Sequence, residues 1–309
     1  MKRIIVSVLI ALLFVTGCRS NPNQNNKEDI NMTYNNYGHE VIIAGIPQKI
    51  VTLGPNCTEL MIALGLENLI IGNTLNNHSR GALEEYKEAY EAIPEINYGS
   101  ATREAVVTSG ADFIYGIDWE FGDSGLDINE LNQFGITVYM NSATTFEEIY
   151  QEIEDLGKIF DVEDKATEFI NYQESRIEAI EVSIKNKEPI KVLVYDSGND
   201  GVFTASGSNF ESLLIEKAGG INIFNDITNK QWITVSYEEI IQRNPDVIII
   251  HDYDSPSVEE KINQIKANPA LSTLDCVKNN KFVVISLESV LPGSRMAYSV
   301  ETFYNGFYE

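Results

Sequence analysis

The segment from residue 146 to 187 constrains the fold of this chain more than any other feature. It contains no proline and a single glycine, Gly157, and apolar residues such as Ile149 and Ile153 recur in it at helical spacing. A break is expected near Asp161, but most of the segment should be helical. Such a helix is too long and too polar for an ordinary crossover between neighbouring strands. We therefore expect it to act as a strut between two parts of the protein.

Short apolar runs alternate with amphipathic ones on both sides of this segment. Residues 49–53 and 112–115 have the composition of buried strands, helical patterns separate such runs, and the alternation resumes after Pro189. This alternation favours parallel strands with right-handed crossovers and a covered sheet. The predicted fold class is α/β, with two Rossmann-like lobes. The predicted division is 39–145 for the first lobe, 146–187 for the connecting helix and 188–309 for the second lobe.

The two halves also resemble each other in sequence. Residues 104–115, EAVVTSGADFIY, align without a gap on residues 238–249, EEIIQRNPDVII, and each stretch predicts a short helix, an aspartate and a buried strand. A shorter match pairs the helix containing Glu59 with the helix containing Glu211. Two matches in the same order along the chain favour two related lobes joined by the long helix.

The amino terminus has the composition of an export signal. Two basic residues precede an apolar core, residues 4–15, which is too short for a bilayer span of roughly 20 residues but suits a signal peptide. The sequence Val-Thr-Gly before Cys18 is similar to a bacterial lipobox, which implies removal of residues 1–17 and lipidation of Cys18. An ordinary secretory signal with a chance cysteine is the alternative. The Asn-rich stretch that follows predicts a flexible tether over residues 18–38.

Charge and cysteine content limit the classes of partner. With 22 basic and 46 acidic residues the formal net charge is −24, whereas nucleic-acid binding depends on basic side chains that neutralise phosphates. Besides Cys18, only Cys57 and Cys276 are present. We interpret both as buried apolar residues, and a bridge between them stays open. The abundance of Asn, Ile, Lys and Glu is typical of an AT-rich genome and favours a Gram-positive bacterium.

Several motifs together resemble one family. They are IVTLGPNCTELMIALG over residues 50–65, NPDVII from Asn244 and PGSR ending at Arg295. Their order is typical of the extracytoplasmic substrate-binding proteins of ABC importers for ferric siderophores, haem and cobalamin. The resemblance extends from residue 40 to the end of the chain. It implies two α/β lobes on a rigid helix, a ligand cleft between them and small motion between the lobes.

The resemblance also implies a function. The protein would be lipid-anchored on the outer face of the membrane, capture a small-molecule metal chelate as a monomer without a cofactor, and deliver it to an ABC permease and its ATPase. The acidic charge favours a neutral or cationic iron(III) hydroxamate over an anionic siderophore, and a corrinoid or haem is the alternative within the family. No P-loop, Gly-x-Ser-x-Gly or His-Glu-x-x-His motif indicates an enzyme. A surface-anchored enzyme and a sensor or adhesion protein are the alternatives from other classes.

Polar and aromatic residues in loops after the predicted strands are the candidate ligand contacts, because ligands bind at the carboxyl ends of parallel strands. The tryptophans are interpreted as pocket walls. The arginines are interpreted as bidentate donors to carboxylates or catecholates, and the family often has a ligand-contacting arginine at the place of Arg295. The candidates are Asn56, His78, Arg80, Arg103, Trp119, Trp232, Tyr253 and Arg295.

Two further roles rest on the resemblance alone. The family has one acidic residue on each lobe that meets arginines of the permease, which implies docking roles for Glu104 and Glu238, with Glu239 as an alternative to Glu238. Haem-carrying relatives ligate iron through a side chain of the cleft. His78 and His251 are therefore the candidate axial ligands if the cargo is haem.

Overall fold

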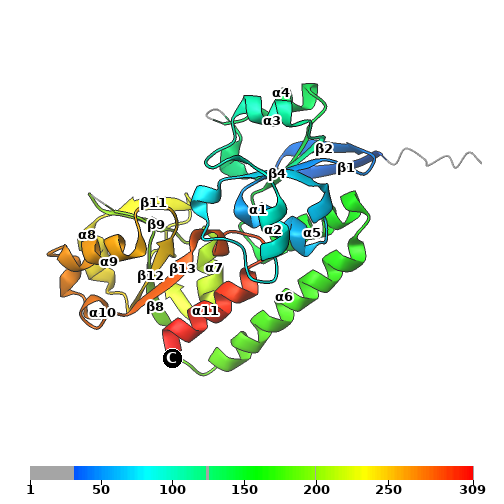
Figure 1. The fold of residues 1–309 in the computed structure, drawn as a ribbon. Helices are drawn as coiled ribbons and strands as arrows, with labels where there is room; N and C mark the ends of the chain where they lie inside the picture. Colours follow the sequence, from blue (N-terminus) through cyan, green and yellow to red (C-terminus); the bar gives the residue numbers. More distant parts are fainter. Residues whose placement is uncertain (1–30, 123–124, 199, 309) are drawn as a thin grey trace, which may run out of the picture.

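Two α/β lobes lie along one long helix in the computed structural model of the chain, which describes residues 31–122, 125–198 and 200–308 (Figure 1). Each lobe is built on its own parallel sheet. The predicted α/β class with two parallel-sheet lobes is confirmed. The predicted signal peptide and the cysteine that follows it lie outside the described residues.

The first lobe contains a five-stranded parallel sheet with the strand order β5-β4-β3-β6-β7. The central strand β3 is buried on both faces, since all four of its side chains are inaccessible to solvent. This explains its largely apolar sequence, Ile-Val-Thr-Leu. The strands are β3 (Ile50–Leu53), β4 (Ile70–Thr74), β5 (Glu95–Asn97), β6 (Phe113–Ile117) and β7 (Thr137–Asn141). The helices are α1 (Pro55–Ala63), α2 (Lys87–Ala92), α3 (Arg103–Ser109) and α4 (Ile128–Gln133).

An antiparallel hairpin precedes this sheet. It consists of β1 (Asn31–Asn36) and β2 (His39–Ala44). Val41 and Ile43, alternating residues of β2, are buried, and the Asn36 side chain donates to the carbonyl oxygen of Met140 at 3.0 Å and accepts from its amide at 2.7 Å. The predicted flexible tether over 18–38 was therefore wrong from residue 31 onward, because this stretch packs against the lobe as a strand.

The predicted connecting segment is helical and is broken at Asp161, as expected from the sequence, so it consists of two helices. α5 (Phe146–Phe160) ends at Asp161, whose φ of 58° is in the left-handed region, and α6 (Glu163–Ile184) follows. The only glycine of this segment allows the two helices to pack closely, since a Cβ on Gly157 would lie 2.8 Å from the Cβ of Ala166. α6 then runs beside both lobes (Figure 1).

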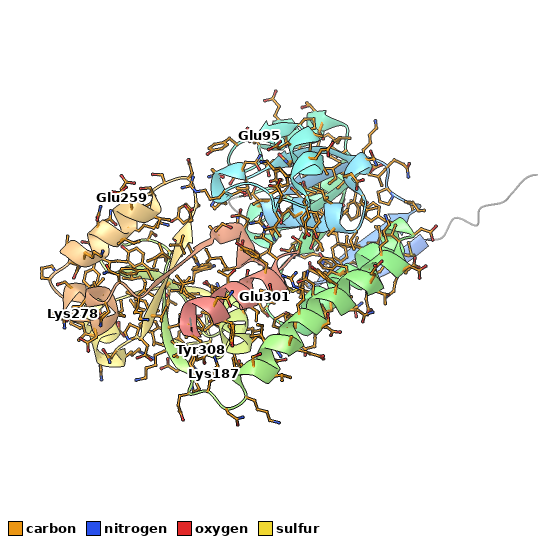
Figure 2. The ribbon with its side chains drawn as sticks, turned by 60° about the horizontal axis from the view of Figure 1, so that its bottom comes forward. Glu95, Lys187, Glu259, Lys278, Glu301 and Tyr308 are labelled. Atoms are coloured by element: carbon orange, nitrogen blue, oxygen red, sulfur yellow. The ribbon has the colours of Figure 1, made fainter. Side chains whose placement is uncertain are left out.

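α6 is bonded to the last helix of the second lobe, α11 (Met296–Tyr308). Arg176 of α6 and Glu301 of α11 form an ion pair at 2.6 Å, and Figure 2 shows Glu301 on α11 beside α6. Lys187, just after α6, lies 4.6 and 4.0 Å from the ring centroids of Tyr304 and Tyr308. These contacts join the strut firmly to the second lobe.

The second lobe contains a four-stranded parallel sheet with the strand order β10-β8-β12-β13, and a separate antiparallel pair, β11-β9. The strands are β8 (Ile190–Tyr195), β9 (Val202–Ala205), β10 (Gly220–Asn222), β11 (Trp232–Val235), β12 (Val247–Asp252) and β13 (Phe282–Ser286). The helices are α7 (Phe210–Lys217), α8 (Tyr237–Arg243), α9 (Val258–Ala267) and α10 (Asp275–Lys278).

The internal repeat of the sequence recurs in the structure. Asp112 and Asp246 each follow a short helix, α3 or α8, and each precedes an inner strand of its sheet. The Asp112 carboxylate accepts the backbone amide of Lys49 at 2.9 Å, and that of Asp246 accepts the amide of Lys191 at 2.9 Å. In each lobe the aspartate therefore joins a helix–strand turn to the beginning of the neighbouring strand.

Candidate functional site

Side chains from both lobes line an open cavity of about 250 Å³. The described residues that line it are His78, Trp119, Asp196, Phe203, Trp232, Tyr253, Leu287 and Leu291. Trp119 and Trp232 also line a smaller adjoining recess. Its polar side chains are Asp118, Asn141, Ser142, Asn209 and Gln231. The structure thus brings four predicted ligand contacts, from both lobes, to one mainly aromatic cavity with a polar recess.

The two tryptophans lie where strands end or begin near the cleft. Trp119 belongs to the 3-10 turn η3 (Asp118–Glu120) directly after β6, and Trp232 is the first residue of β11. Trp119 is 44% exposed. The indole of Trp232 stacks on Phe203 with ring centroids 5.3 Å apart. Trp119 therefore offers an accessible aromatic face, whereas Trp232 is held in place by its neighbour.

His78 and Tyr253 form another part of the aromatic wall. Their ring centroids are 6.4 Å apart with an interplanar angle of 29°, and His78 lies 6.2 Å from Trp119. Burial lowers the pKa of His78, so the imidazole is neutral at pH 7. Its Nδ1 lies 2.9 Å from Oδ1 of Asn77. This acceptor requires the proton on Nδ1 and leaves Nε2 with its lone pair.

His251 lies behind the cavity wall and is fully buried. Nδ1 lies 3.0 Å from the carboxylate of Asp196, and Nε2 lies 3.1 Å from that of Glu211. Burial alone would lower the pKa of His251, but Glu211 and Asp196 outweigh it and raise the pKa to about 9. The structure does not support the predicted role of His251 as a haem ligand, because the ring is fully buried and both of its nitrogens face carboxylates of the protein.

Arg295 is part of a buried ion-pair network. Its side chain is 5% exposed and lies 2.6 Å from Glu59 of α1 and 3.1 Å from Glu288. All three guanidinium nitrogens are hydrogen-bonded to protein oxygens. The prediction that Arg295 contacts the ligand was therefore wrong, because its donors are already used between the lobes.

Asn56 lies behind the lining of the recess and is 2% exposed. Its amide donates to Oδ1 of Asn141 at 2.8 Å and to the carbonyl oxygen of Pro292 at 2.9 Å. Both acceptors belong to residues of the recess. The structure therefore gives Asn56 an indirect role in place of the predicted direct contact with the ligand. Its bonds to Asn141 of the first lobe and Pro292 of the second lobe position residues that line the recess.

The other two arginines lie outside the cavity lining. Arg80 forms an ion pair with Asp252 of the second lobe at 2.7 Å and donates to the main-chain oxygen of Tyr253 at 2.5 Å. Arg103 begins α3 and pairs with Glu130 at 2.5 Å on the surface of the first lobe. The predicted ligand contact of Arg103 was wrong, because α3 presents this residue to solvent away from the cavity. Arg80 bridges the lobes at the edge of the cavity.

The two predicted docking residues occupy equivalent, exposed positions. Glu104 is the second residue of α3 and Glu238 the second residue of α8. The alternative, Glu239, accepts the amide of Ser236 at 3.0 Å in a capping box. The structural role of Glu239 leaves Glu238 as the better match to Glu104.

The candidate contacts did not include the carboxylate of the cavity or the polar side chains of the recess, although the sequence places Asp118 and Asp196 in loops after predicted strands. Asp196 comes directly after β8, and Asp118 directly after β6. The first polar residue after a parallel strand is the signal that would have found both. Leu287 and Leu291 carry no such signal, because apolar residues after a strand are equally typical of a core.

The two cysteines of the lobes are unpaired. Cys57 and Cys276 are buried and free, one in each lobe, so the bridge left open by the sequence does not form. Burial raises the pKa of the Cys276 thiol to about 11. Both residues therefore serve as small apolar side chains.

The described part of the chain was also searched for membrane spans and metal sites. In residues 31–122, 125–198 and 200–308, no helix has the length and apolar character needed to cross a bilayer. The same residues contain no group of three or more potential metal-ligating side chains.

Known proteins share this fold. The family described as periplasmic binding protein matches residues 50–287. This chain belongs to that family. The resemblance that the sequence motifs carried is thereby confirmed.

Relatives and solved structures agree with this assignment. The uncharacterized ABC transporter substrate-binding lipoprotein YvrC of Bacillus subtilis is 24% identical over 98% of this chain and 95% of its own length. The vitamin B12-binding protein of Vibrio parahaemolyticus is 26% identical over 65% of this chain and 70% of its own. A protein of the ABC-type Fe3+-hydroxamate transport system from Saccharomonospora viridis is 21% identical and matches with a TM-score of 0.77, covering 91% of this chain and 100% of that one. This structural likeness concerns the fold.

Proposed function

We propose that this chain is an extracytoplasmic substrate-binding protein that captures an iron(III) chelate and delivers it, as a monomer, to an ABC permease and its ATPase. The observation that carries the proposal is the cavity between the lobes, with walls formed by Trp119, Trp232 and Tyr253. Concave, mainly apolar cavities with a few polar groups are typical of small-molecule sites. In this role the protein binds and releases its ligand without chemical change.

The charges around the cavity favour a neutral or cationic chelate. Asp196 lines the cavity and Asp118 the recess, and none of the described lining residues is an arginine or a lysine. Arg80 and Arg295 are bonded to carboxylates of the protein. Asp196 is paired with the charged His251, whereas Asp118 accepts a hydrogen bond from the neutral Ser142 hydroxyl, so it is the field of Asp118 that opposes an anionic ligand. A neutral or cationic ferric hydroxamate meets this condition and has apolar surface for the aromatic walls.

A corrinoid is the second candidate. It is favoured by sequence relatives named vitamin B12-binding proteins, at 26% identity for two of them. The amide arms of a corrinoid would find hydrogen-bonding partners in Asn209 and Gln231 of the recess. Haem is less favoured, because its propionates would approach Asp196 without a lysine or arginine in the described lining.

Tryptophan fluorescence tests the proposal directly, because both tryptophans of the chain line the cavity. The purified protein is titrated with a cationic and a neutral ferric trihydroxamate, an anionic ferric catecholate, cyanocobalamin and haemin. We expect submicromolar quenching by a hydroxamate complex. Tight binding of cyanocobalamin alone would transfer the function to a corrinoid, and a preference for the catecholate would refute the charge argument. No response to any compound would overturn the proposal.

We also propose that Cys18 is lipidated and anchors the protein to the outer face of the membrane of a Gram-positive cell. The lipobox-like sequence before Cys18 supports this, as does a relative that is named a lipoprotein. We expect the wild type to incorporate labelled palmitate. The Cys18→Ala variant should lose the label and be released from membranes. Equal membrane retention of both would refute the anchor.

A further inference from the structure

One segment of the first lobe reaches onto the second lobe beside the cavity. Residues 76–81, called the strap here, follow β4 and contain the 3-10 turn η2 (Asn76–His78). The strap carries His78 of the cavity wall, whose ring stacks against Tyr253 of the second lobe. The strap is therefore both a wall of the cavity and a link between the lobes.

The strap is bonded to residues 252–254 of the second lobe on both sides of this aromatic contact. Before His78, the carbonyl oxygen of Asn77 accepts the amide of Asp254 at 3.2 Å. After it, Arg80 pairs with Asp252 at 2.7 Å. The contact between the rings of His78 and Tyr253 thus lies between two polar contacts, each of which joins the first lobe to the second.

Among the described residues, two ion pairs of different character join the first lobe to the second. The side chains of Arg80 and Asp252 are 42% and 26% exposed, whereas those of Arg295 and Glu59 are 5% and 1% exposed. An exposed pair is weak and is screened by salt. Breaking a buried pair leaves an uncompensated charge and is far more costly. The Arg80–Asp252 pair is therefore the weaker of the two. Glu288 of the second lobe also holds the strap, since it accepts the Ser79 hydroxyl at 2.9 Å and the Arg80 amide at 3.0 Å.

We propose that the Arg80–Asp252 ion pair is a latch that controls ligand entry and exit at the cavity. This inference rests on the proposed function, because it assigns the regulation of the same site. With the latch closed, His78 stays against Tyr253 and this side of the cavity is shut. When it opens, the two rings separate by a small movement, while the Glu59–Arg295 pair and the bonds of Glu288 to the strap keep the lobes together.

The latch is tested first on the protein without ligand, by acrylamide quenching of tryptophan emission. In a Trp119→Phe background, Trp232 is the sole emitter and reports access to the cavity. Arg80→Ala should raise the quenching constant of Trp232. The matched control is Arg243→Ala, because Arg243 likewise bonds one aspartate, Asp226, and one main-chain oxygen, but within a single lobe.

A second variant and a salt series complete the test. Asp252→Asn preserves the shape of the side chain and should raise the quenching constant as Arg80→Ala does. The exchange Arg80→Asp with Asp252→Arg should return it toward the wild-type value. Raising the salt concentration should increase quenching in the parent background and have little effect in Arg80→Ala. Equal quenching in Arg80→Ala, Asp252→Asn and the Arg243→Ala control, with circular dichroism showing all folded, would overturn the latch.

The quenching result does not depend on the identity of the cargo, so it is independent of the titration that tests the proposed function. With a ferric trihydroxamate that binds, Arg80→Ala should dissociate about two- to fivefold faster than the wild type, the range expected for an exposed pair. Arg243→Ala should dissociate at the wild-type rate. An unchanged dissociation rate in Arg80→Ala would also overturn the latch.

Discussion

Glu59 and Arg295 form a bidentate ion pair that joins the two lobes in the interior of the protein. Oε1 and Oε2 of Glu59 lie 2.6 Å from Nη2 and Nε of Arg295. In the related helix of the second lobe, Glu211 holds the equivalent position and contacts His251 at 3.1 Å. The repeat therefore has one buried glutamate in each lobe. The partner of Glu59 comes from the other lobe, whereas the partner of Glu211 comes from its own.

Removal of Arg295 should destabilise the protein strongly. Arg295→Ala leaves Glu59 and Glu288 buried without their cation, so we expect a loss of about 3–5 kcal/mol in the free energy of unfolding. Urea unfolding followed by circular dichroism measures this loss. Arg103→Ala, which removes an exposed pair that solvent screens, should cost far less. Similar losses in the two variants would contradict the structural role assigned to Arg295.

The stability of the second lobe should depend on the charge of His251. Its pKa in the folded protein, about 9, lies above its ordinary value of 6.5. The contribution of His251 to the free energy of unfolding is therefore fully present below about pH 6.5 and is lost as the pH rises through about 9. The pKa of the neighbouring Lys261 is lowered by burial to about 8, so Lys261 acts in the opposite direction above pH 8.

His251→Asn should remove the loss of stability between pH 6.5 and 9. For the wild type this loss is on the order of 3 kcal/mol before the opposing effect of Lys261. Urea midpoints measured from pH 6 to pH 9.5 give the profile. Glu211→Gln should also make the profile flatter, since it removes the carboxylate that raises the pKa of His251 most. A wild-type profile as flat as that of both variants would show that His251 is not charged in the fold.

Trp232 should contribute more to ligand affinity than its size alone suggests, because Phe203 holds it in place. We expect Trp232→Ala to weaken binding of a ferric trihydroxamate by about 2 kcal/mol, roughly thirtyfold. Trp232→Phe keeps an aromatic face and should lose less than about tenfold. Isothermal calorimetry measures both. Phe134→Ala, which removes an exposed aromatic outside the cavity, is the control, and equal affinities in all three would remove Trp232 from the site.

The sequence predicted the parts of the site that follow from strand order. Trp119 and Tyr253 follow β6 and β12, and parallel strands bring their carboxyl ends to one edge of a sheet. Arg295 could not be placed in this way. A guanidinium in a loop looks the same in the sequence whether it faces a ligand or a carboxylate. Its partner, Glu59, is distant in the chain and meets it only through the packing of the lobes.

The beginning of the fold shows a similar limit. The Asn-rich composition before residue 39 predicted a tether, yet Asn36 is 3% exposed. A polar residue is buried at low cost when its hydrogen bonds are satisfied. Both groups of the Asn36 amide are bonded to the backbone of Met140. Composition does not report such a partner, so the hairpin was missed although its apolar residues alternate.

Glu104 and Glu238 should act in delivery and not in capture. Both are exposed at the second position of equivalent helices, α3 and α8. Reversing their charge in Glu104→Lys with Glu238→Lys would place like charges against basic residues of a permease, which slows association and weakens docking. We expect at least about tenfold weaker stimulation of the permease ATPase in proteoliposomes, with ligand affinity unchanged in the fluorescence titration.

The matched control for this pair is Glu178→Lys, which reverses an exposed charge on α6 away from both helices. It should stimulate the ATPase as the wild type does. Glu104→Lys and Glu238→Lys alone should each produce part of the loss, because the pseudo-symmetric lobes would each contact one half of the permease. Full stimulation by the double variant would refute the docking role of both glutamates. Weaker ligand binding by the double variant would instead place them in the capture step.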